Sequence, residues 1–300
     1  MRMRALGRTG LRVSELGYGG GQLRGTPRIW NGRPVSDEQA SRILHAVLDA
    51  GINFIDTASV YGRSEAFIGR HIASRRDEYF IATKFGCELK DMGDWDDTPR
   101  NWSPEFLQAS LDESLRRLKT DTVDLLQLHT PTFDDFMRYE LLRPLEDARL
   151  AGKTRFIGLS VTQPHMDGFA PYFSQFDTVQ LPYSAYETYY EDWVTRAVEA
   201  GCGTIIRGGV AQGGADKDGA GRALWERAKL DDLLDGETRT GFMLRYTLSH
   251  PHASTVIVAT LNPDHLRENL AAAARGPLSN DTLREVKRRL SVARSESGAH

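Results

Sequence analysis

The sequence lacks three features that would each indicate a class of protein. No apolar run approaches the roughly 20 residues of a membrane span, and no hydrophobic leader follows Met1. Only two cysteines occur, Cys87 and Cys202, without CxxC spacing, which indicates a reducing compartment and no disulfide framework or zinc site. The net charge of -3 lacks the basic bias of a nucleic-acid binder. We therefore expect a cytoplasmic protein that binds neither nucleic acid nor membrane.

What the chain does contain is a regular alternation of strand-like and helical segments. Its 300 residues, 40% of them hydrophobic, suffice for a large core, and no linker or low-complexity stretch divides residues 1–300. Buried-strand patterns are predicted at 16–19, 54–56, 79–83, 123–128, 156–160, 178–181, 203–206 and 254–258. Helical patterns follow most of them, one starting after the capping box at Ser36 and another at Ser103 and Pro104.

About eight strand-then-helix units predict an α/β fold with a parallel sheet. Eight units in roughly 250 residues match a (β/α)8 TIM barrel, here with an N-terminal β-hairpin at 6–14 and an extra C-terminal helix after Asn280. A doubly wound sheet is the competing architecture, but its Gly-x-Gly-x-x-Gly fingerprint is missing after the first strand. We expect a single barrel domain over residues 1–300.

Polar residues stand where three of the predicted strands end. Asp56, Lys84 and His129 each follow a separate apolar run, and Tyr61 lies in the loop just beyond Asp56. Because the carboxyl ends of barrel strands open on one face, we expect these four side chains to converge there. They are the candidate catalytic residues.

The four side-chain types suit proton transfer to a carbonyl oxygen. A free tyrosine, with a pKa near 10, is a poor acid at neutral pH, but an ammonium held charged by a carboxylate favours its phenolate. Asp56, Lys84 and Tyr61 would thus form a relay, and His129 would orient a substrate carbonyl by a hydrogen bond. Tyr61 would then protonate the developing alkoxide as a hydride arrives.

Each residue taken alone has an ordinary structural explanation. Asp56 can cap a loop, Tyr61 can be a packed loop aromatic, and His129 can be a structural histidine. Lys84 differs because a lysine in a buried strand needs a partner. A metal site at Asp56 and His129 lacks a further ligand at suggestive spacing. The combination of all four favours the catalytic interpretation.

Several motifs together carry a resemblance to a known family. They include Asp-Thr-Ala at 56–58 and Tyr-Gly-x-Ser-Glu at 61–65, and the matching segments are 6–14, 51–65, 82–84, 123–129, 152–160 and 263–269. On these segments the sequence resembles the aldo-keto reductase family, NAD(P)H-dependent (β/α)8-barrel oxidoreductases. The resemblance implies that Tyr61 is the general acid/base and that hydride transfer between a nicotinamide and an aldehyde, ketone or alcohol needs no metal.

The resemblance also implies the residues that contact the cofactor. Ser160 and Gln180 would hold the nicotinamide carboxamide, although Val161 stands where the family usually has Asn. Arg207 replaces an aromatic residue that commonly stacks on the nicotinamide ring; it would stack instead, bind an anionic substrate group or pair with a carboxylate. The full set implied is Gly20, Asp56, Ser160, Gln180, Arg207, Gly208, Val210, Gly213, Thr260, His265, Glu268 and Asn269.

The segment at 259–269 would contact the adenine end of the cofactor. Asn262 begins a predicted helix whose N-terminus favours phosphate, and Glu268 and Asn269 match adenine contacts of the family. His265 stands where an arginine is common, which leaves it with Thr260, and with Arg267 as a further candidate, to bind a 2′-phosphate. We expect NADP(H), with NAD(H) as the alternative.

The rim loops would form the substrate pocket. The segment from Phe85 to Trp102 and the segment around Trp30 supply aromatic and polar groups that suit sugars, hydroxy-ketones or aromatic aldehydes equally. Two other functions stay open at this point. One is a non-catalytic nicotinamide-binding subunit of the same fold that senses redox state or acts as a scaffold, and the other is a metal-dependent barrel lyase or isomerase.

Overall fold

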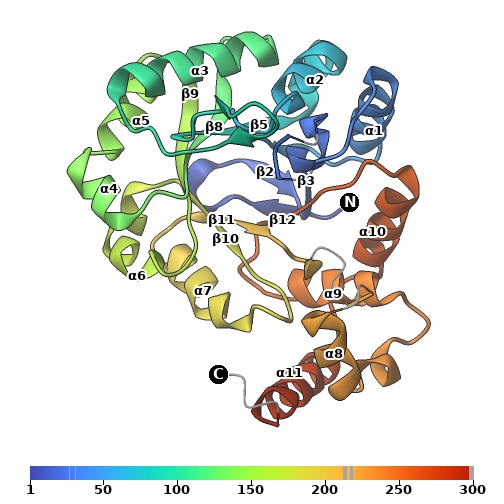
Figure 1. Ribbon diagram of the computed structural model, residues 1–300. Helices are drawn as coiled ribbons and strands as arrows, with labels where there is room; N and C mark the ends of the chain where they lie inside the picture. The colour runs from blue at the N-terminus through green and yellow to red at the C-terminus, as the bar shows by residue number, and fades with distance from the viewer. Residues whose placement is uncertain (27, 31, 212–214, 217–218, 297–300) are drawn as a thin grey trace.

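Eight parallel strands close into a barrel in the computed structural model of the chain, which describes residues 1–26, 28–30, 32–211, 215–216 and 219–296 (Figure 1). The barrel strands are β3 (Leu16–Gly19), β4 (Phe54–Asp56), β5 (Phe80–Phe85), β8 (Val123–His129), β9 (Thr154–Ser160), β10 (Thr178–Pro182), β11 (Gly203–Arg207) and β12 (Thr255–Val258). Neighbours in this series pair in parallel, and β12 pairs with β3 to close the ring. The predicted (β/α)8 barrel is confirmed.

Helices cover the outside of the barrel (Figure 1). The longer ones are α1 (Asp37–Asp49), α2 (Ser64–His71), α3 (Pro104–Leu118), α5 (Leu142–Leu150), α7 (Glu191–Glu199), α9 (Arg239–Leu248), α10 (Pro263–Arg275) and α11 (Asn280–Ser295). Ser36 forms the predicted capping box with Gln39, and Ser103 accepts from the backbone N–H of Phe106 to cap α3. No helix within the described ranges is long and apolar enough to cross a membrane, and the cytoplasmic location stays a prediction.

The amino end of the barrel is closed by the predicted hairpin. Strands β1 (Met3–Ala5) and β2 (Arg12–Ser14) pair antiparallel, and Asn53 accepts a hydrogen bond from the Ser14 N–H at 2.7 Å. Apolar side chains of the hairpin pack with those that point into the barrel from β4, β5, β8 and β11, in a cluster of Leu6, Leu11, Val13, Phe54, Ala82, Leu125 and Ile205. The hairpin therefore fills the bottom of the barrel.

Several short elements were not predicted. They are α4 (Phe133–Arg138), α6 (Met166–Phe169), α8 (Ala220–Arg227) and the hairpin of β6 (Lys90–Asp91) with β7 (Asp96–Asp97). Strand β5 also runs through Lys84 to Phe85, two residues beyond its predicted end, because it pairs with β8 as far as Leu128. Elements of this length depend on contacts with distant parts of the chain, which local sequence patterns do not contain.

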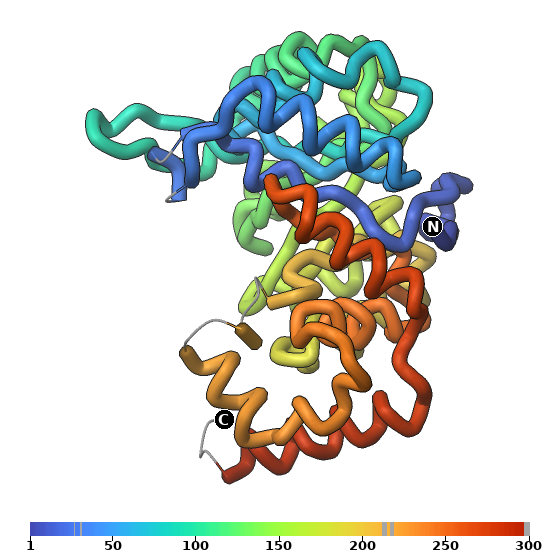
Figure 2. Tube along the Cα trace, turned by 90° about the vertical axis from the view of Figure 1, so that its right-hand side faces the viewer, coloured from blue at the N-terminus to red at the C-terminus, as the bar shows by residue number. Residues whose placement is uncertain are grey.

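Two loops at the carboxyl end of the barrel are joined to each other. In the β6–β7 hairpin, the backbone N–H of Asp96 donates to the carbonyl of Arg28 at 3.0 Å, and the Arg28 guanidinium returns a hydrogen bond to the Asp96 carboxylate at 3.0 Å. Figure 2 shows the two loops projecting together from one end of the barrel. They form part of the rim around the strand ends.

Candidate active site

Adjacent strands bring Asp56 and Lys84 into contact at the carboxyl end of the barrel. Asp56 ends β4 and Lys84 is the fifth residue of β5, and these strands are neighbours. The Lys84 ammonium lies 2.5 Å from Oδ2 of Asp56 and also donates to the carbonyl of Thr57 at 2.8 Å. Both side chains are almost fully buried, in a region of low dielectric constant. Each charge therefore needs a partner, and the two residues compensate each other.

Tyr61 and His129 lie beside this pair. The Lys84 ammonium is 5.2 Å from the centroid of the Tyr61 ring, and the His129 ring meets Tyr61 edge-on with centroids 5.9 Å apart. His129 is the last residue of β8, the strand next to β5. The structure therefore brings the four candidate catalytic residues together.

The loop that carries Tyr61 is built tightly. Residue 62 has φ +52, and a Cβ there would lie 2.5 Å from the carbonyl oxygen of Arg24, so the turn after Tyr61 requires glycine. The Arg63 N–H donates to that same carbonyl at 2.9 Å. Thr57, at the start of the loop, donates a hydrogen bond of 2.9 Å from its hydroxyl to the hydroxyl of Ser64, where α2 begins.

A buried carboxylate connects this loop to its neighbours. Glu65 accepts from the Thr83 hydroxyl at 2.6 Å and lies 3.2 Å from the Arg117 guanidinium, which also donates to the carbonyl of Ser59 at 3.1 Å. Burial raises the pKa of Glu65, against the opposing effects of Thr83 and Arg117. The Tyr61 loop is thereby attached to both β5 and α3.

The second oxygen of Asp56 accepts from two amides. Oδ1 lies 3.0 Å from Nε2 of Gln127 and 2.8 Å from Nε2 of Gln180. Gln180 in turn accepts from the Ser160 hydroxyl at 3.2 Å, so these residues form one hydrogen-bonded chain. Gln127 was missed by the sequence analysis; the available signal was a polar residue within the otherwise apolar end of the run that leads to His129.

The electrostatic environment keeps His129 neutral. Its pKa lies well below the usual 6.5 because of burial, followed by the positive charges of Lys84, Arg100 and Arg207. A neutral imidazole carries one N–H and one acceptor nitrogen. His129 can therefore donate a single hydrogen bond from its ring.

Arg207 and the loop that follows it lie on the same rim. Arg207 ends β11 half-buried and forms no ion pair with a carboxylate in the described part of the chain. Burial raises the pKa of nearby Glu187, which the charge of Arg207 opposes. Gly208 has φ +72 and Val210 is half-buried, whereas Gly213 lies outside the described residues.

Gly20 marks a place where the backbone must stay bare. A Cβ there would lie 2.5 Å from the Ser64 hydroxyl and 3.1 Å from the Asp56 carbonyl oxygen. The expected adenine-end residues lie around the start of α10, where Asn262 caps the helix by accepting from the Asp264 N–H at 2.9 Å. Thr260 and Asn269 are buried there, and His265 and Glu268 are exposed. Arg267 is ion-paired with Asp264.

An aromatic side chain borders the site on its open side. Trp30 meets Tyr61 edge-on, with ring centroids 5.9 Å apart, and is 49% exposed. The Arg24 guanidinium lies over the Trp30 ring, 5.6 Å from its centroid. Trp102, in contrast, is buried and packs where a Cβ of Gly86 would stand, so it is part of the core. The rim segment around Trp30 thus reaches the mouth, as expected.

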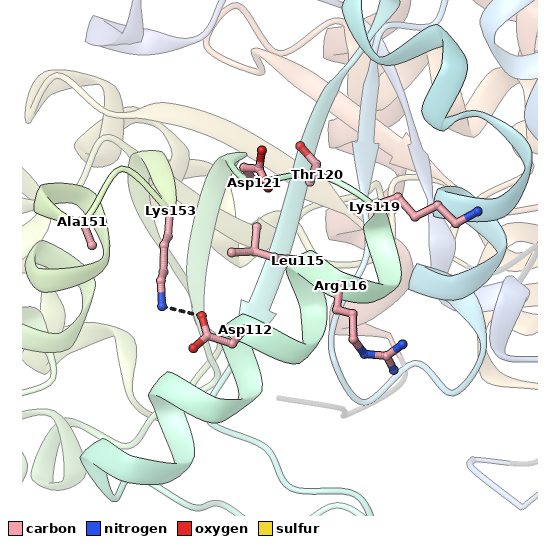
Figure 3. Close-up of a pocket in the computed structure, with 8 residues that line it drawn as sticks. All are labelled: Asp112, Leu115, Arg116, Lys119, Thr120, Asp121, Ala151 and Lys153. Atoms are coloured by element: carbon pink, nitrogen blue, oxygen red, sulfur yellow. Dashed lines mark hydrogen bonds and ion pairs between the residues drawn. The ribbon is translucent and has the colours of Figure 1, made fainter.

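The structure also bears on metal binding and on a second candidate site. In the part of the chain that the structure describes, no trio of His, Cys, Asp or Glu side chains is placed to hold a metal ion. An open groove is lined by Asp112, Leu115, Arg116, Lys119, Thr120, Asp121, Ala151 and Lys153 (Figure 3). Its residues include the turns that lead into β8 and β9, so the groove lies at the amino ends of these strands, away from Tyr61.

Comparisons with known proteins agree with the barrel fold. The uncharacterized oxidoreductase YqkF of Bacillus subtilis is 28% identical over 310 residues, which cover 96% of each chain. L-galactose dehydrogenase of Arabidopsis thaliana is 28% identical over 309 residues, 95% of this chain and 93% of that protein. The aldo-keto reductase AKR11C1 from Bacillus halodurans, in its holo form, superimposes with a TM-score of 0.83 at 27% identity over 96% of both chains. The profile of the Aldo/keto reductase family matches residues 15–290, and the chain belongs to this family of oxidoreductases.

Proposed function

We propose that the chain reduces an aldehyde or ketone to an alcohol, or catalyses the reverse reaction, with Tyr61 as general acid/base. The observation that carries the proposal is the buried ion pair of Lys84 and Asp56 directly beside the Tyr61 ring. An ammonium in this position stabilises the phenolate that remains after proton donation. The family membership supports the same class of reaction.

Each residue has one role in the proposed step. The substrate carbonyl oxygen lies between Tyr61 and His129, whose ring N–H orients it by a hydrogen bond. Tyr61 donates its phenolic proton to this oxygen as negative charge develops. Lys84 stabilises the phenolate that results, and Asp56 keeps the ammonium charged in its buried position. A nicotinamide cofactor, when bound, supplies or accepts the hydride.

The residues around the strand ends fit such a cofactor. The backbone of Gly20 packs closely against Ser64 and the carbonyl of Asp56 at the end of β4, and Ser160 and Gln180 present polar atoms that suit a carboxamide. Gly208 and Val210 follow β11 on the same rim. Thr260, His265, Glu268 and Asn269 lie around the N-terminus of α10, where a helix end favours phosphate. We propose NADP(H) in preference to NAD(H). His265 would contact the 2′-phosphate in place of the arginine that is common at this position in the family.

The first test is a fluorescence titration of the purified protein with NADPH and, separately, with NADH. We expect saturable binding with tighter affinity for NADPH, and NADPH oxidation on a broad panel of aldehydes and ketones. Tighter binding of NADH would correct the cofactor assignment. Binding without turnover on any carbonyl or alcohol would favour a non-catalytic nicotinamide-binding subunit. Binding of neither cofactor would contradict the proposal as a whole.

A further inference from the structure

His129 is in contact with a thiol that the proposed mechanism does not use. Sγ of Cys87 lies 3.4 Å from Nδ1 of His129, and the Arg100 guanidinium donates to the same sulfur at 3.0 Å. Cys87 is 3% exposed, and its backbone pairs with that of Arg100 across an isolated bridge. The thiol is therefore held between a cation and the imidazole.

Two placements of the hydrogens are compatible with these positions. In the first, the Cys87 thiol donates to Nδ1 of His129, and the ring proton is on Nε2. In the second, Nδ1–H donates to the sulfur, and the thiol turns to the carbonyl oxygen of His129. The two placements give Nε2 opposite hydrogen-bonding roles, because only the first leaves an N–H there; in the second, Nε2 is an acceptor.

The surrounding contacts favour the first placement. The sulfur already accepts from Arg100, which has no acceptor to offer in return. The carbonyl oxygen of His129 is 3.8 Å from the sulfur and already accepts from the Thr130 hydroxyl at 2.8 Å, whereas Nδ1 is closer. Burial raises the pKa of Cys87 to about 11, so the thiol keeps the proton that it donates.

We propose that Cys87 and Arg100 are positioning residues that hold His129 in the tautomer with its proton on Nε2. Nδ1 accepts from the thiol, and Nε2–H is left for the substrate oxygen. The tautomer itself does not depend on the proposed function; its consequence for carbonyl binding does.

Arg100 also holds the backbone beside the histidine. Its Nε donates to the carbonyl of Thr130 at 3.2 Å, and another of its nitrogens donates to the Thr130 hydroxyl. Thr130 has φ +53, an uncommon conformation for a threonine. A single exposed guanidinium on the β5–α3 loop thus contacts both the turn after His129 and the thiol that faces Nδ1.

The test is long-range ¹H–¹⁵N correlation NMR of the full ¹⁵N-labelled chain without substrate or cofactor. The His129 ring is assigned by its loss in His129→Gln, and the spectrum shows which nitrogen carries the proton. We expect Nε2–H in the wild type and in Cys87→Ser, which retains a donor. Cys87→Ala should give a mixture of tautomers or mainly Nδ1–H. A proton on Nδ1 of His129 in the wild type, or a tautomer in Cys87→Ala that is the same as in the wild type, would overturn the proposal.

Matched variants separate positioning from general disturbance. Cys202→Ala removes the other buried thiol, which donates to the Phe173 carbonyl at 2.9 Å, and should leave the His129 ring unchanged. Arg100→Gln, at an exposed position, should weaken the preference for Nε2–H without unfolding the chain. In turnover assays, Cys87→Ala should lower kcat/KM by about tenfold, in proportion to the competent fraction, and Cys87→Ser should restore most of it. If the NMR spectra show the expected His129 tautomers but neither the wild type nor any variant turns over a carbonyl or alcohol, only the proposed function is contradicted.

Discussion

The Lys84 ammonium and the Asp56 carboxylate are in contact at 2.5 Å inside a site where neither is exposed by more than 2%. Burying two charges costs desolvation energy, which is recovered only when both partners are present and their other atoms are hydrogen-bonded. Here Gln127, Gln180 and the carbonyl of Thr57 supply those hydrogen bonds. The pair therefore contributes to the fold only as an intact unit.

We predict that Asp56→Asn both destabilises the protein and abolishes most turnover. Removal of one partner leaves a buried, uncompensated ammonium, which typically costs about 3–5 kcal/mol. Urea unfolding measures the change. Glu38→Gln is the control, because it removes a carboxylate from the exposed Arg42 pair, and such pairs contribute about 1 kcal/mol or less. Equal stability of the two variants would show that Asp56 is not needed to compensate Lys84.

Tyr61→Phe should lose turnover but keep the cofactor. Only the proton donor is removed, so we expect kcat to fall by about 10²–10⁴-fold, while fluorescence titration gives an NADPH affinity close to that of the wild type. The matched control is Tyr139→Phe, which removes a phenol from an exposed ring. Near-normal turnover of Tyr61→Phe on a ketone would assign the acid to another group.

Stability should fall on acidification because of buried histidines. His250 is 4% exposed, and burial lowers its pKa to about 4, while its Nδ1 accepts from the His252 N–H at 3.2 Å. The unfolded chain, with an ordinary pKa of about 6.5, binds this proton first, so the contribution is complete above pH 6.5 and is lost as pH falls toward 4. Each such histidine adds a slope of up to about 1.4 kcal/mol per pH unit.

Urea unfolding at a series of pH values checks this prediction. His250→Gln should reduce the slope between pH 6 and pH 5 by up to the equivalent of one proton, and His129, whose pKa is also lowered, should account for part of the remainder. An unchanged slope in His250→Gln would mean that this ring is protonated in the folded state.

Arg207→Trp should bind the oxidised cofactor more tightly than the wild type does. If Arg207 faces the nicotinamide, its guanidinium opposes the positive charge of the oxidised ring, and an indole would replace repulsion with cation–π attraction. We expect a gain of a few-fold in affinity for NADP⁺ and little change for NADPH. Unchanged or weaker binding would show that Arg207 points to another group, and Glu187 is a candidate because the charge of Arg207 opposes the rise of its pKa on burial.

The strand ends of the barrel were predictable because they depend on local patterns. Apolar runs that stop at Asp56, Lys84 and His129 indicate both the strands and the edge at which they meet. The starts of α1 and α3 were equally clear, since capping at Ser36 and Ser103 depends on residues within one turn.

The contacts between strands were not predictable in the same way. Gln127 reaches Asp56 across 71 residues of sequence, and which face of its strand it occupies depends on the parallel register of β5 and β8. Cys87 showed no motif, and its place beside His129 follows from the path of a loop. Trp102 ends the segment that was expected to contribute to the pocket but is buried against Gly86, a packing that the composition of a long loop does not reveal.

The hairpin that closes the amino end of the barrel blocks access of ligands to the site from that end. With Leu6, Leu11 and Val13 packed into the bottom, whatever reaches Tyr61 must enter through the rim where β4, β5 and β8 end. Under the proposed function, cofactor and substrate would share this entrance. We therefore expect the ligand that binds deeper to bind first and leave last, which is an ordered kinetic mechanism.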